Sequence, residues 1–466
     1  FVNGHPVATT IVRDSLTREI TGGGGDTITI GERMRDHGFK AGLVDDFRVF
    51  GRQLSPLEVR DLVEPGVLEA TLTAASDADL LADHAAFACD PETAALRSRL
   101  QTARRSRGAR VERAAEIMVM RELPEPKVAY VLERGEYDQR RQAVTADTPA
   151  ALPPFPSGQP RNRLGLARWL VEPDHPLLAR VTVNRIWQSL FGLGLVQTPE
   201  DFGSQSAKPV YPAVLDLLAW KFSHPVADGG FGWDLKRLLK AIMRSRTYRQ
   251  RSIADARTMA DDPINARLAR GPRHRLPAEM IRDQALAASG LLVDRLGGPP
   301  VKPYDMPESF KPEPAGTGDS LYRRSLYTYW RRTGPAPVLE SLDAPPRLVC
   351  VARRDTTDTP LHAFVLLNGP QFVEAARVLA ERLLAEHNGR GSDAAERAFA
   401  ILTSRAPDAT EREIIRDMLA GQQSWYESHP ADALDLMAVG ARPWSVNASA
   451  VDVAALTATI NGLMNF

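Results

Sequence analysis

The sequence predicts an α+β protein in which a β-rich antiparallel segment precedes a large, mainly α-helical domain. Short runs of β-branched and aromatic residues, separated by Gly, Asp and Asn, occupy the first 64 residues, a pattern typical of strands and turns. From residue 162 onward, apolar residues instead recur every three or four positions, which is typical of amphipathic helices. The 466 residues, of which 43% are hydrophobic, suffice for two or three domains with cores of their own.

Residues 1–64 predict the closing strands of a β-sandwich. Three runs, FVNGHPVATTIV, DTITIGE and AGLVDDFRVFGRQL, combine strand-forming residues with turn-forming Gly, Asp and Asn. They resemble the C-terminal part of laminin-G-like, concanavalin A-like jelly rolls. The resemblance implies an incomplete antiparallel jelly-roll fragment whose other strands lie upstream of Phe1, and it implies carbohydrate as a ligand class. We therefore expect antiparallel strands over residues 1–54 with an exposed apolar face.

A first helix is expected directly after these strands. Ser55 can accept hydrogen bonds from the first free amides, Pro56 suits the first helical position, and Glu58 completes a favourable helix start. Asp45 and Asp46 precede this helix. We interpret them as strand-end turn residues, with a calcium or sugar ligand as the alternative.

Residues 65–115 are predicted to form a helical connector with a basic face. Seven arginines fall within residues 97–113. No aromatic residues are interleaved among them, and the whole chain balances 58 basic against 58 acidic residues. We therefore interpret this face as a solvated helix surface and expect no nucleic-acid partner.

Residues 116–160 are predicted to hold a small β element followed by a Pro-rich linker. Two β-like runs, EIMVM and KVAYVL, are expected to pair with each other. We expect this element to dock on the helical domain and not on the jelly-roll fragment. The stretch TPAALPPFPSGQPRN then marks a domain boundary, because Pro-rich segments favour an extended backbone.

Residues 161–466 are predicted to form the mainly helical domain. Helical spacing of apolar residues is found over residues 164–170, 183–190, 213–222, 235–248, 278–292, 360–384, 394–404 and 411–425. The helix at 360 is expected to begin with Thr359 as the capping acceptor and Pro360 at its first position. Its predicted apolar stripe consists of Leu361, Phe364, Val365 and Phe372.

Five ordered stretches in this domain carry a resemblance to a known family. They are NRLGLARWLVEPDHPLLARVTVNRIWQSLFGLGLVQTPEDFG, LKRLLKAIMRSRTYRQ, RLPAEMIRDQALAASGLL, YRRSLY and RRDTTDTPLHAFVLLNGPQF. Together they resemble successive signature blocks of the planctomycete secreted-protein C-terminal domain, domain of unknown function fifteen-fifty-three, over about residues 110–466. The sequence departs from the family pattern at His362, where Gln is more typical.

The resemblance implies a secreted, periplasmic or cell-surface protein, although the sequence shows no signal peptide and starts like an internal fragment. Longer family members often carry a cytochrome-c-like domain. Any haem c would therefore belong to a missing upstream domain, and we expect no cofactor within these 466 residues.

Several chemistries are not indicated by the sequence. Two cysteines, Cys89 and Cys350, cannot build a disulfide framework or a cysteine zinc site, and the nine scattered histidines lack metal-ligand spacing. Nucleophile-elbow, zinc-protease and phosphate-loop motifs are missing. No apolar run approaches roughly 18 residues, so no membrane span is predicted.

The candidate site consists of arginines that stand beside amide, hydroxyl or acidic residues. A guanidinium on the flank of an apolar helix needs a carboxylate, carbonyls or an anionic ligand, because an unpaired buried charge costs several kcal/mol. We expect these blocks to converge, with Arg353 or Arg354 in contact reach of Asp201, Asp283 or the partners of Arg185. The candidates are Asn184, Arg185, Asp201, Arg246, Arg282, Asp283, Arg324, Arg353, Arg354 and Asp355.

Two interpretations of this centre stay open. It is an internal ion-pair network that fixes helix packing, which we favour, or it is a site for an anion or an acidic sugar. At the level of the whole protein we favour a glycan-associated binding and scaffold protein, with unknown protein partners. The alternative is an enzyme acting on polysaccharide, which could receive electrons from the missing haem domain. The sequence leaves open whether the protein is an enzyme.

Overall fold

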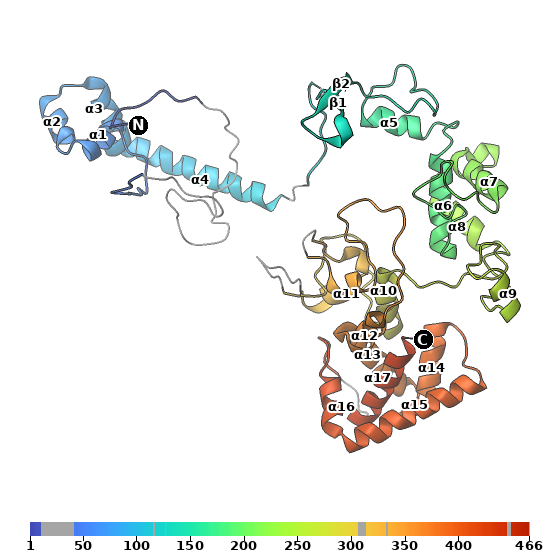
Figure 1. The fold of residues 1–466 in the computed structure, drawn as a ribbon. Coiled ribbons are helices and arrows are strands. Elements are labelled where there is room, and N and C mark those ends of the chain that lie inside the picture. Colours follow the sequence, from blue (N-terminus) through green and yellow to red (C-terminus); the bar gives the residue numbers. More distant parts are fainter. Residues whose placement is uncertain are drawn as a thin grey trace. The chain divides into compact units, whose positions relative to one another are not determined.

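The computed structural model describes residues 1–10, 42–114, 117–125, 127–305, 314–331, 334–444 and 449–465. The chain divides into two compact units, Phe1–Lys127 and Val128–Phe466, whose elements are labelled in Figure 1. Among the described residues, no helix is both long enough and apolar enough to cross a membrane.

The regular secondary structure described in the first unit consists of helices. Its elements are α1 (Pro56–Val63), α2 (Val67–Ala74), α3 (Ala78–His84), the π-helical turn η1 (Ala85–Cys89) and α4 (Pro91–Arg113). Residues 1–10 and 42–54 form no strand, only an isolated antiparallel bridge between Val2 and His5. The remaining strands predicted there, over residues 11–41, lie outside the described part of the chain. The strands predicted over residues 1–10 and 42–54 are therefore wrong, and the jelly-roll fragment as a whole stays a prediction.

The predicted start of α1 is confirmed in detail. The hydroxyl of Ser55 accepts from the Glu58 amide at 3.2 Å, and the Glu58 carboxylate accepts from the Ser55 amide at 2.8 Å, so both free amides are satisfied. The two hydrogen bonds that Arg52 donates to Glu58 lower the pKa of that carboxyl to about 2. Ser55 is also buried, with its Oγ 3.0 Å from Nδ1 of the buried His84, which ties α1 to α3.

Replacing Ser55 with alanine is expected to destabilise the first unit by about 2–4 kcal/mol, because it removes a helix cap and leaves the His84 ring nitrogen without a partner. Hydrogen exchange of the α1 and α3 amides measures this loss. Ser76→Ala is the matched control, since Ser76 is exposed and precedes the capping Asp77. Equal protection of the α1 and α3 amides from hydrogen exchange in the two variants would contradict the expectation.

The small sheet differs from the sequence prediction. Strand β1 (Ala129–Leu132) pairs antiparallel with β2 (Arg140–Val144), with Ala129 opposite Val144. Residues 117–120, the described part of the EIMVM run that was predicted to pair with β1, form no strand. The downstream partner is favoured because Arg134 and Gly135, both with positive φ, reverse the chain within the short 3-10 turn η2 (Glu133–Gly135). The hairpin belongs to the second unit, and its docking on the helices of that unit stays a prediction.

The second unit is otherwise helical. Its helices are α5 (Arg163–Leu170), α6 (Leu178–Phe191), α7 (Pro212–Ser223), α8 (Leu235–Met243), α9 (Ala256–Asp261), α10 (Ala278–Ser289), α11 (Pro337–Ser341), α12 (Pro360–Asn368), α13 (Pro370–Glu386), α14 (Gly391–Thr403), α15 (Ala409–Ser428), α16 (Pro430–Met437) and α17 (Ala450–Leu463), with 3-10 turns η3 (Val226–Asp228), η4 (Gly318–Tyr322) and η5 (Ser325–Tyr327).

The predicted helices are found, but several differ in extent, and α10 ends at Ser289 instead of at residue 292. Helix α8 ends at Met243, and the predicted helix 360–384 is two helices, α12 and α13. The break falls at Gly369, whose backbone is extended, because Pro370 cannot donate the amide that a continuous helix needs.

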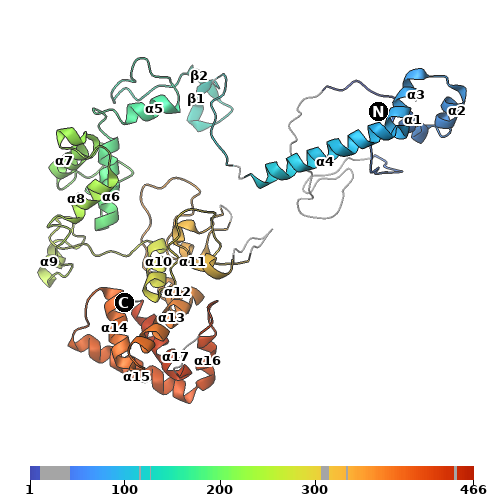
Figure 2. The same cartoon turned by 180° about the vertical axis from the view of Figure 1, so that it is seen from behind.

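Helix α17 was not predicted, yet nine of its 14 residues are buried. It packs against α13, α14, α15 and α16 (Figures 1 and 2). Its sequence is apolar or small around nearly its whole circumference, so it shows no stripe, and such a helix is stable only when neighbours surround it.

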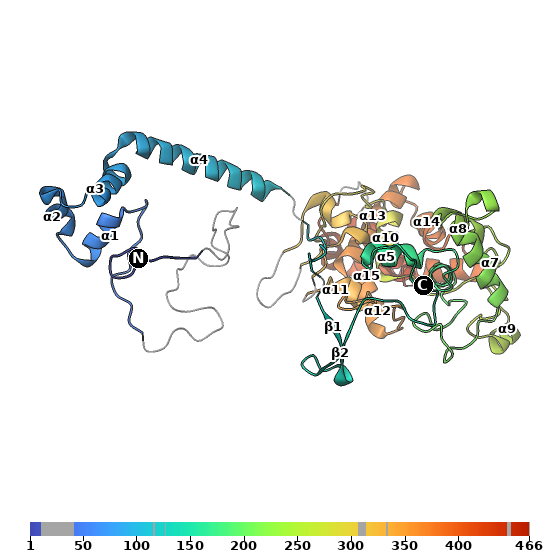
Figure 3. The same cartoon turned by 90° about the horizontal axis from the view of Figure 1, so that it is seen from above.

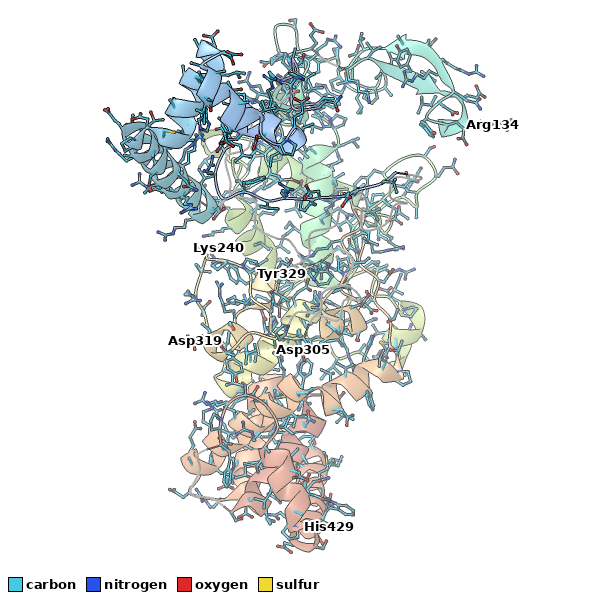
Figure 4. All side chains as sticks on the ribbon, turned by 90° about the vertical axis from the view of Figure 1, so that its left-hand side faces the viewer. Arg134, Lys240, Asp305, Asp319, Tyr329 and His429 are labelled. Atoms are coloured by element: carbon cyan, nitrogen blue, oxygen red, sulfur yellow. The ribbon has the colours of Figure 1, made fainter. Side chains whose placement is uncertain are left out.

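Helices α7 and α15 end with the same pattern, Trp-x-x-Ser-His-Pro. At the end of α15, His429 (labelled in Figure 4) stacks on Trp425 with ring centroids 3.9 Å apart, and its Nδ1 lies 3.0 Å from the Trp425 carbonyl. His224 and Trp220 repeat this arrangement at the end of α7. The same tryptophan carbonyl also accepts the backbone amide of the histidine, so the imidazole adds a second contact at the last turn, and the following proline prevents the helix from continuing.

Candidate functional site

The Asn184–Arg185 pair is divided between core and solvent. Asn184 is fully buried, and its side-chain amide donates to the Val196 carbonyl at 3.0 Å and accepts from the Val196 amide at 2.8 Å. It therefore fastens the loop after α6 onto that helix. Arg185, one position further round the helix, is exposed. Asp201 accepts from the Gly203 amide at 2.7 Å and shapes a turn.

Arg282 and Asp283 lie at the centre of a sealed polar network. Arg282 is 1% exposed, and all of its donor nitrogens are used by the protein. Its Nε donates to Gln371 at 2.8 Å, and its two terminal nitrogens donate to the carbonyls of Arg323 and Leu321 at 2.9 and 2.6 Å. Asp283 accepts from the Ser325 amide at 2.7 Å. Every donor nitrogen of Arg282 thus already binds a protein acceptor, and the side chain is shielded from solvent.

The remaining predicted arginines do not join this network. Arg324 pairs with Asp294 at 2.8 Å, Arg353 approaches Glu200 at 3.6 Å, and Arg354 makes a bidentate pair with Glu279 at 2.6 and 3.1 Å. Their partners are thus neither Asp201 nor Asp283. Arg246 and Asp355 are exposed. The expected single centre does not form among the described residues, although the loop at 353–354 does connect distant segments.

The start of α12 also differs from the prediction. Thr359 occupies the capping position, but its side chain makes no capping hydrogen bond. Leu361 and Phe364 are 51% and 62% exposed, whereas Val365 packs against the core and Phe372, on α13, is 2% exposed, so half of the predicted apolar stripe faces the core. The buried residue of α12 is His362, because α12 presents that side to α11 and α13.

A cleft beside His362 is the candidate site in the second unit. It has a volume of about 400 Å³ and lies between α10, α12 and the C-terminal ends of α14 and α17. Its apolar wall consists of Leu276, Ile281, Ala285, Leu342, Ala363, Leu366, Phe372, Leu402, Leu463 and Met464. Its polar groups come from His274, Arg275, Gln284, Asp358, Thr359, His362, Thr403 and Asn465.

Arg275 and His362 are held in the cleft wall by Asp343. Arg275 ion-pairs with the Asp343 carboxylate and donates to the Leu342 carbonyl at 3.2 Å. Asp343 also accepts from the Thr357 amide at 2.7 Å and lies 3.9 Å from Nε2 of His362. Burial alone would raise the pKa of Asp343, but the Thr357 hydrogen bonds, Arg275 and His362 lower it below its ordinary value.

Two buried nitrogen atoms in this wall have no partner within the described protein. They are Nε of Arg275 and Nδ1 of His362. An unsatisfied buried polar atom costs about 1–3 kcal/mol, so water or a ligand that bonded to them would be favoured. An oxygen-rich ligand suits both, because Arg275 only donates and His362 can donate or accept, depending on its tautomer.

His274 links the cleft to α6. Its ring packs on Gly192, the residue that ends α6 with φ +80°, so closely that a Cβ at Gly192 would lie 2.9 Å from the imidazole. Burial lowers the pKa of His274, so its neutral form is favoured near pH 7. The imidazole then offers one donor and one acceptor at the cleft.

The sequence contains only a weak signal for this cleft. His362 stands out as the departure from the family pattern, but its partners Arg275 and Asp343 lie in separate segments that only the fold brings together. No group of three His, Cys, Asp or Glu residues that could hold a metal ion is found in the described ranges.

Comparison with known proteins places the chain in a family. A family model described as "PSD1: Protein of unknown function (DUF1553)" matches residues 162–419, which extend from the start of α5 into α15 and include most of the cleft. No curated protein and no solved structure matches the chain significantly. Because the match covers more than half of the sequence, the chain belongs to the PSD1 family of proteins of unknown function (DUF1553).

Proposed function

We propose that this protein is a glycan-binding module whose cleft holds a neutral sugar residue or a short neutral glycan. The observation that carries the proposal is the pairing of an apolar wall with polar groups that include two unsatisfied buried nitrogens. A sugar ring fits such a cleft, because its C–H groups pack on an apolar wall and its hydroxyl groups donate and accept hydrogen bonds. The volume of about 400 Å³ falls in the usual range for small-ligand sites.

The charges around the cleft favour a neutral ligand over an acidic one. The positive charge of Arg275 is already matched by Asp343, and Asp358 adds a negative charge at the cleft surface. His274 is neutral near pH 7. A carboxylate or sulfate would therefore have no uncompensated arginine to bind, and Arg282, which the sequence suggested for that role, is fully used by the protein.

The same residues favour binding over glycoside hydrolysis. Hydrolysis of a glycosidic bond usually requires two carboxyl groups facing the bond, one of them protonated. Among the described residues that line the cleft, Asp358 is the one acidic residue. Asp343, behind the wall, has a lowered pKa and so remains ionised and committed to Arg275 and Thr357. We propose, with the family resemblance and the jelly-roll prediction in support, that this binding serves a secreted or cell-envelope protein.

Filling the cleft is expected to abolish binding. Ala363 lines the cleft and is exposed, so Ala363→Trp places an indole in it without removing a core residue. A panel of neutral sugars, with glucuronate as the acidic comparison, is titrated by calorimetry. We expect at least one neutral sugar to bind, and its Kd to rise more than about tenfold, or 1.4 kcal/mol, in this variant. Leu361→Trp is the control, because Leu361 is exposed on the same helix outside the cleft.

Two substitutions separate the hydrogen bonding of His362 from the size of its side chain. His362→Gln retains a donor and an acceptor, so binding should remain within a few-fold of the original chain, whereas His362→Leu should lose roughly tenfold. Preference for glucuronate over every neutral sugar would contradict the neutral-ligand assignment. Binding that survives Ala363→Trp unchanged would place the ligand elsewhere.

A further inference from the structure

Charge is sharply segregated along the first unit. Residues 42–92, here called the acidic head, contain eleven acidic and three basic residues. Residues 93–113, the rest of α4 and here called the basic arm, contain seven arginines and one acidic residue. Residues 11–41 contain five acidic and five basic residues, so they do not change the difference in charge between the acidic head and the basic arm. The near-zero charge of the whole chain conceals two strongly charged segments of opposite sign.

The basic arm cannot fold back to neutralise its own head. Arg97 anchors it, donating to the carbonyls of Phe87 and Ala86 at 2.7 and 2.9 Å and lying over the Phe87 ring. Beyond this point α4 continues as one helix, which Figure 3 shows leading away from α1 and α2. At 1.5 Å per residue, Arg113 lies roughly 21 Å further along the axis than Arg99, and a helix of this kind is stiff.

Both segments present charges without partners. Five exposed arginines of the arm make no ion pair with any described residue: Arg99, Arg104, Arg107, Arg110 and Arg113. Four exposed carboxylates of the head are likewise unpaired within the described ranges: Glu64, Glu69, Asp79 and Asp83. Arginines three apart on a helix repel each other, so the arm is stabilised when an acidic surface covers it.

Exposed apolar residues lie beside both sets of charges. Leu96 and Leu100, four residues apart on α4, are 55% and 50% exposed. On the head, Leu62, Val63 and Leu72 are 40%, 52% and 51% exposed. Protein interfaces combine an apolar centre with a charged rim, whereas a polyanion would match the arginines and leave the leucines uncovered. This combination favours a protein partner over nucleic acid or an acidic polysaccharide.

We propose that the partner is a second copy of this chain, with the basic arm of one copy docking on the acidic head of the next. The charge complementarity required is already present in the sequence. Such a head-to-tail contact leaves one free head and one free arm on every pair, so it continues into a chain or closes into a ring. Self-association of this kind would place many glycan-binding clefts on one assembly, but it does not depend on what those clefts bind.

Sedimentation velocity of the 466-residue chain tests the proposal. At about 0.01 M salt, where the screening length is roughly 30 Å, we expect concentration-dependent association, and at about 1 M, where it is roughly 3 Å, we expect monomers. Arg107→Glu/Arg110→Glu reverses part of the arm, and Glu69→Arg/Asp83→Arg reverses part of the head. Each variant alone should associate at least tenfold more weakly.

Mixing the two variants provides the decisive measurement. The reversed head of one chain then matches the reversed arm of the other, so association should return. Lys240→Glu/Arg244→Glu on α8 (Lys240 is labelled in Figure 4) reverses two exposed basic residues elsewhere and should change nothing. Circular dichroism verifies that each variant is folded. A chain that stays monomeric at low salt, association that the arm reversal does not weaken, or a mixture that does not recover would each overturn the proposal, as would a monomer whose arm instead retains DNA or heparin.

Discussion

Replacement of Arg282 by methionine is expected to lower the free energy of unfolding of the second unit by about 3–5 kcal/mol. Methionine fills a similar volume but donates no hydrogen bond. The carbonyls of Leu321 and Arg323 and the Gln371 side chain would then lose a donor in a place that water does not reach. Because these acceptors lie on two separate segments, residues 321–323 and helix α13, the loss should loosen the packing of α10 against η4, η5 and α13.

The matched control for this variant is Arg185→Met. Arg185 is exposed on α6, so its replacement should change stability by no more than about 0.5 kcal/mol. Urea unfolding followed by circular dichroism and by tryptophan fluorescence gives both values. Equal midpoints for the two variants would show that the Arg282 network contributes no net stability.

The sequence predicts local features of this fold well because local chemistry determines them. The capping arrangement at Ser55 needs only residues within three positions of each other, and it is found as expected. Amphipathic helices such as α14 and α15 are also identified, since one face of each meets the core and the other meets water. Here the sequence pattern and the packing carry the same information.

The burial of Asn184, Arg185 and Arg282 depends on tertiary packing and is not predicted from the sequence. Asn184 and Arg185 are adjacent, yet one is buried and the other exposed, because consecutive helical residues point about 100° apart. Arg282 is buried because Gln371, 89 positions away, and the carbonyls near Arg323 surround it. Those partners belong to loops and helices whose relative placement depends on tertiary packing, which a single sequence does not specify.

The cleft was missed for the same reason. Its polar residues come from the segment before α10, from α12 and from the ends of α14 and α17. None of these segments carries a motif with fixed spacing, and Thr403 and Asn465 follow helical stretches that look purely structural. A cleft assembled from helix ends leaves no periodic signal in the sequence.

Deletion of residues 449–466 is expected to unfold the C-terminal helices α13–α16, which is the largest effect we predict. Val453, Leu456 and Ile460 of α17 are each 0% exposed, and burial of one such side chain contributes about 1.5–3 kcal/mol. Loss of these three alone amounts to about 5–9 kcal/mol, which is comparable to the whole net stability of a typical domain, about 5–15 kcal/mol.

The expected result is a partial loss of helical circular dichroism together with rapid proteolysis within α13–α15. The loss should be partial because the apolar cluster formed by α6, α7 and α8 contains no residue of α17 and should persist. Leu456→Ala provides a milder form of the same test, with an expected cost of about 2–5 kcal/mol, and Leu434→Ala, at a site 55% exposed on α16, is its control. A truncated chain that kept its full helicity and protease resistance would mean that α13, α14 and α15 form a core without α17. That outcome is difficult to reconcile with Leu379, Leu383 and Phe399, which are almost fully buried in the same cluster and would lose part of their cover.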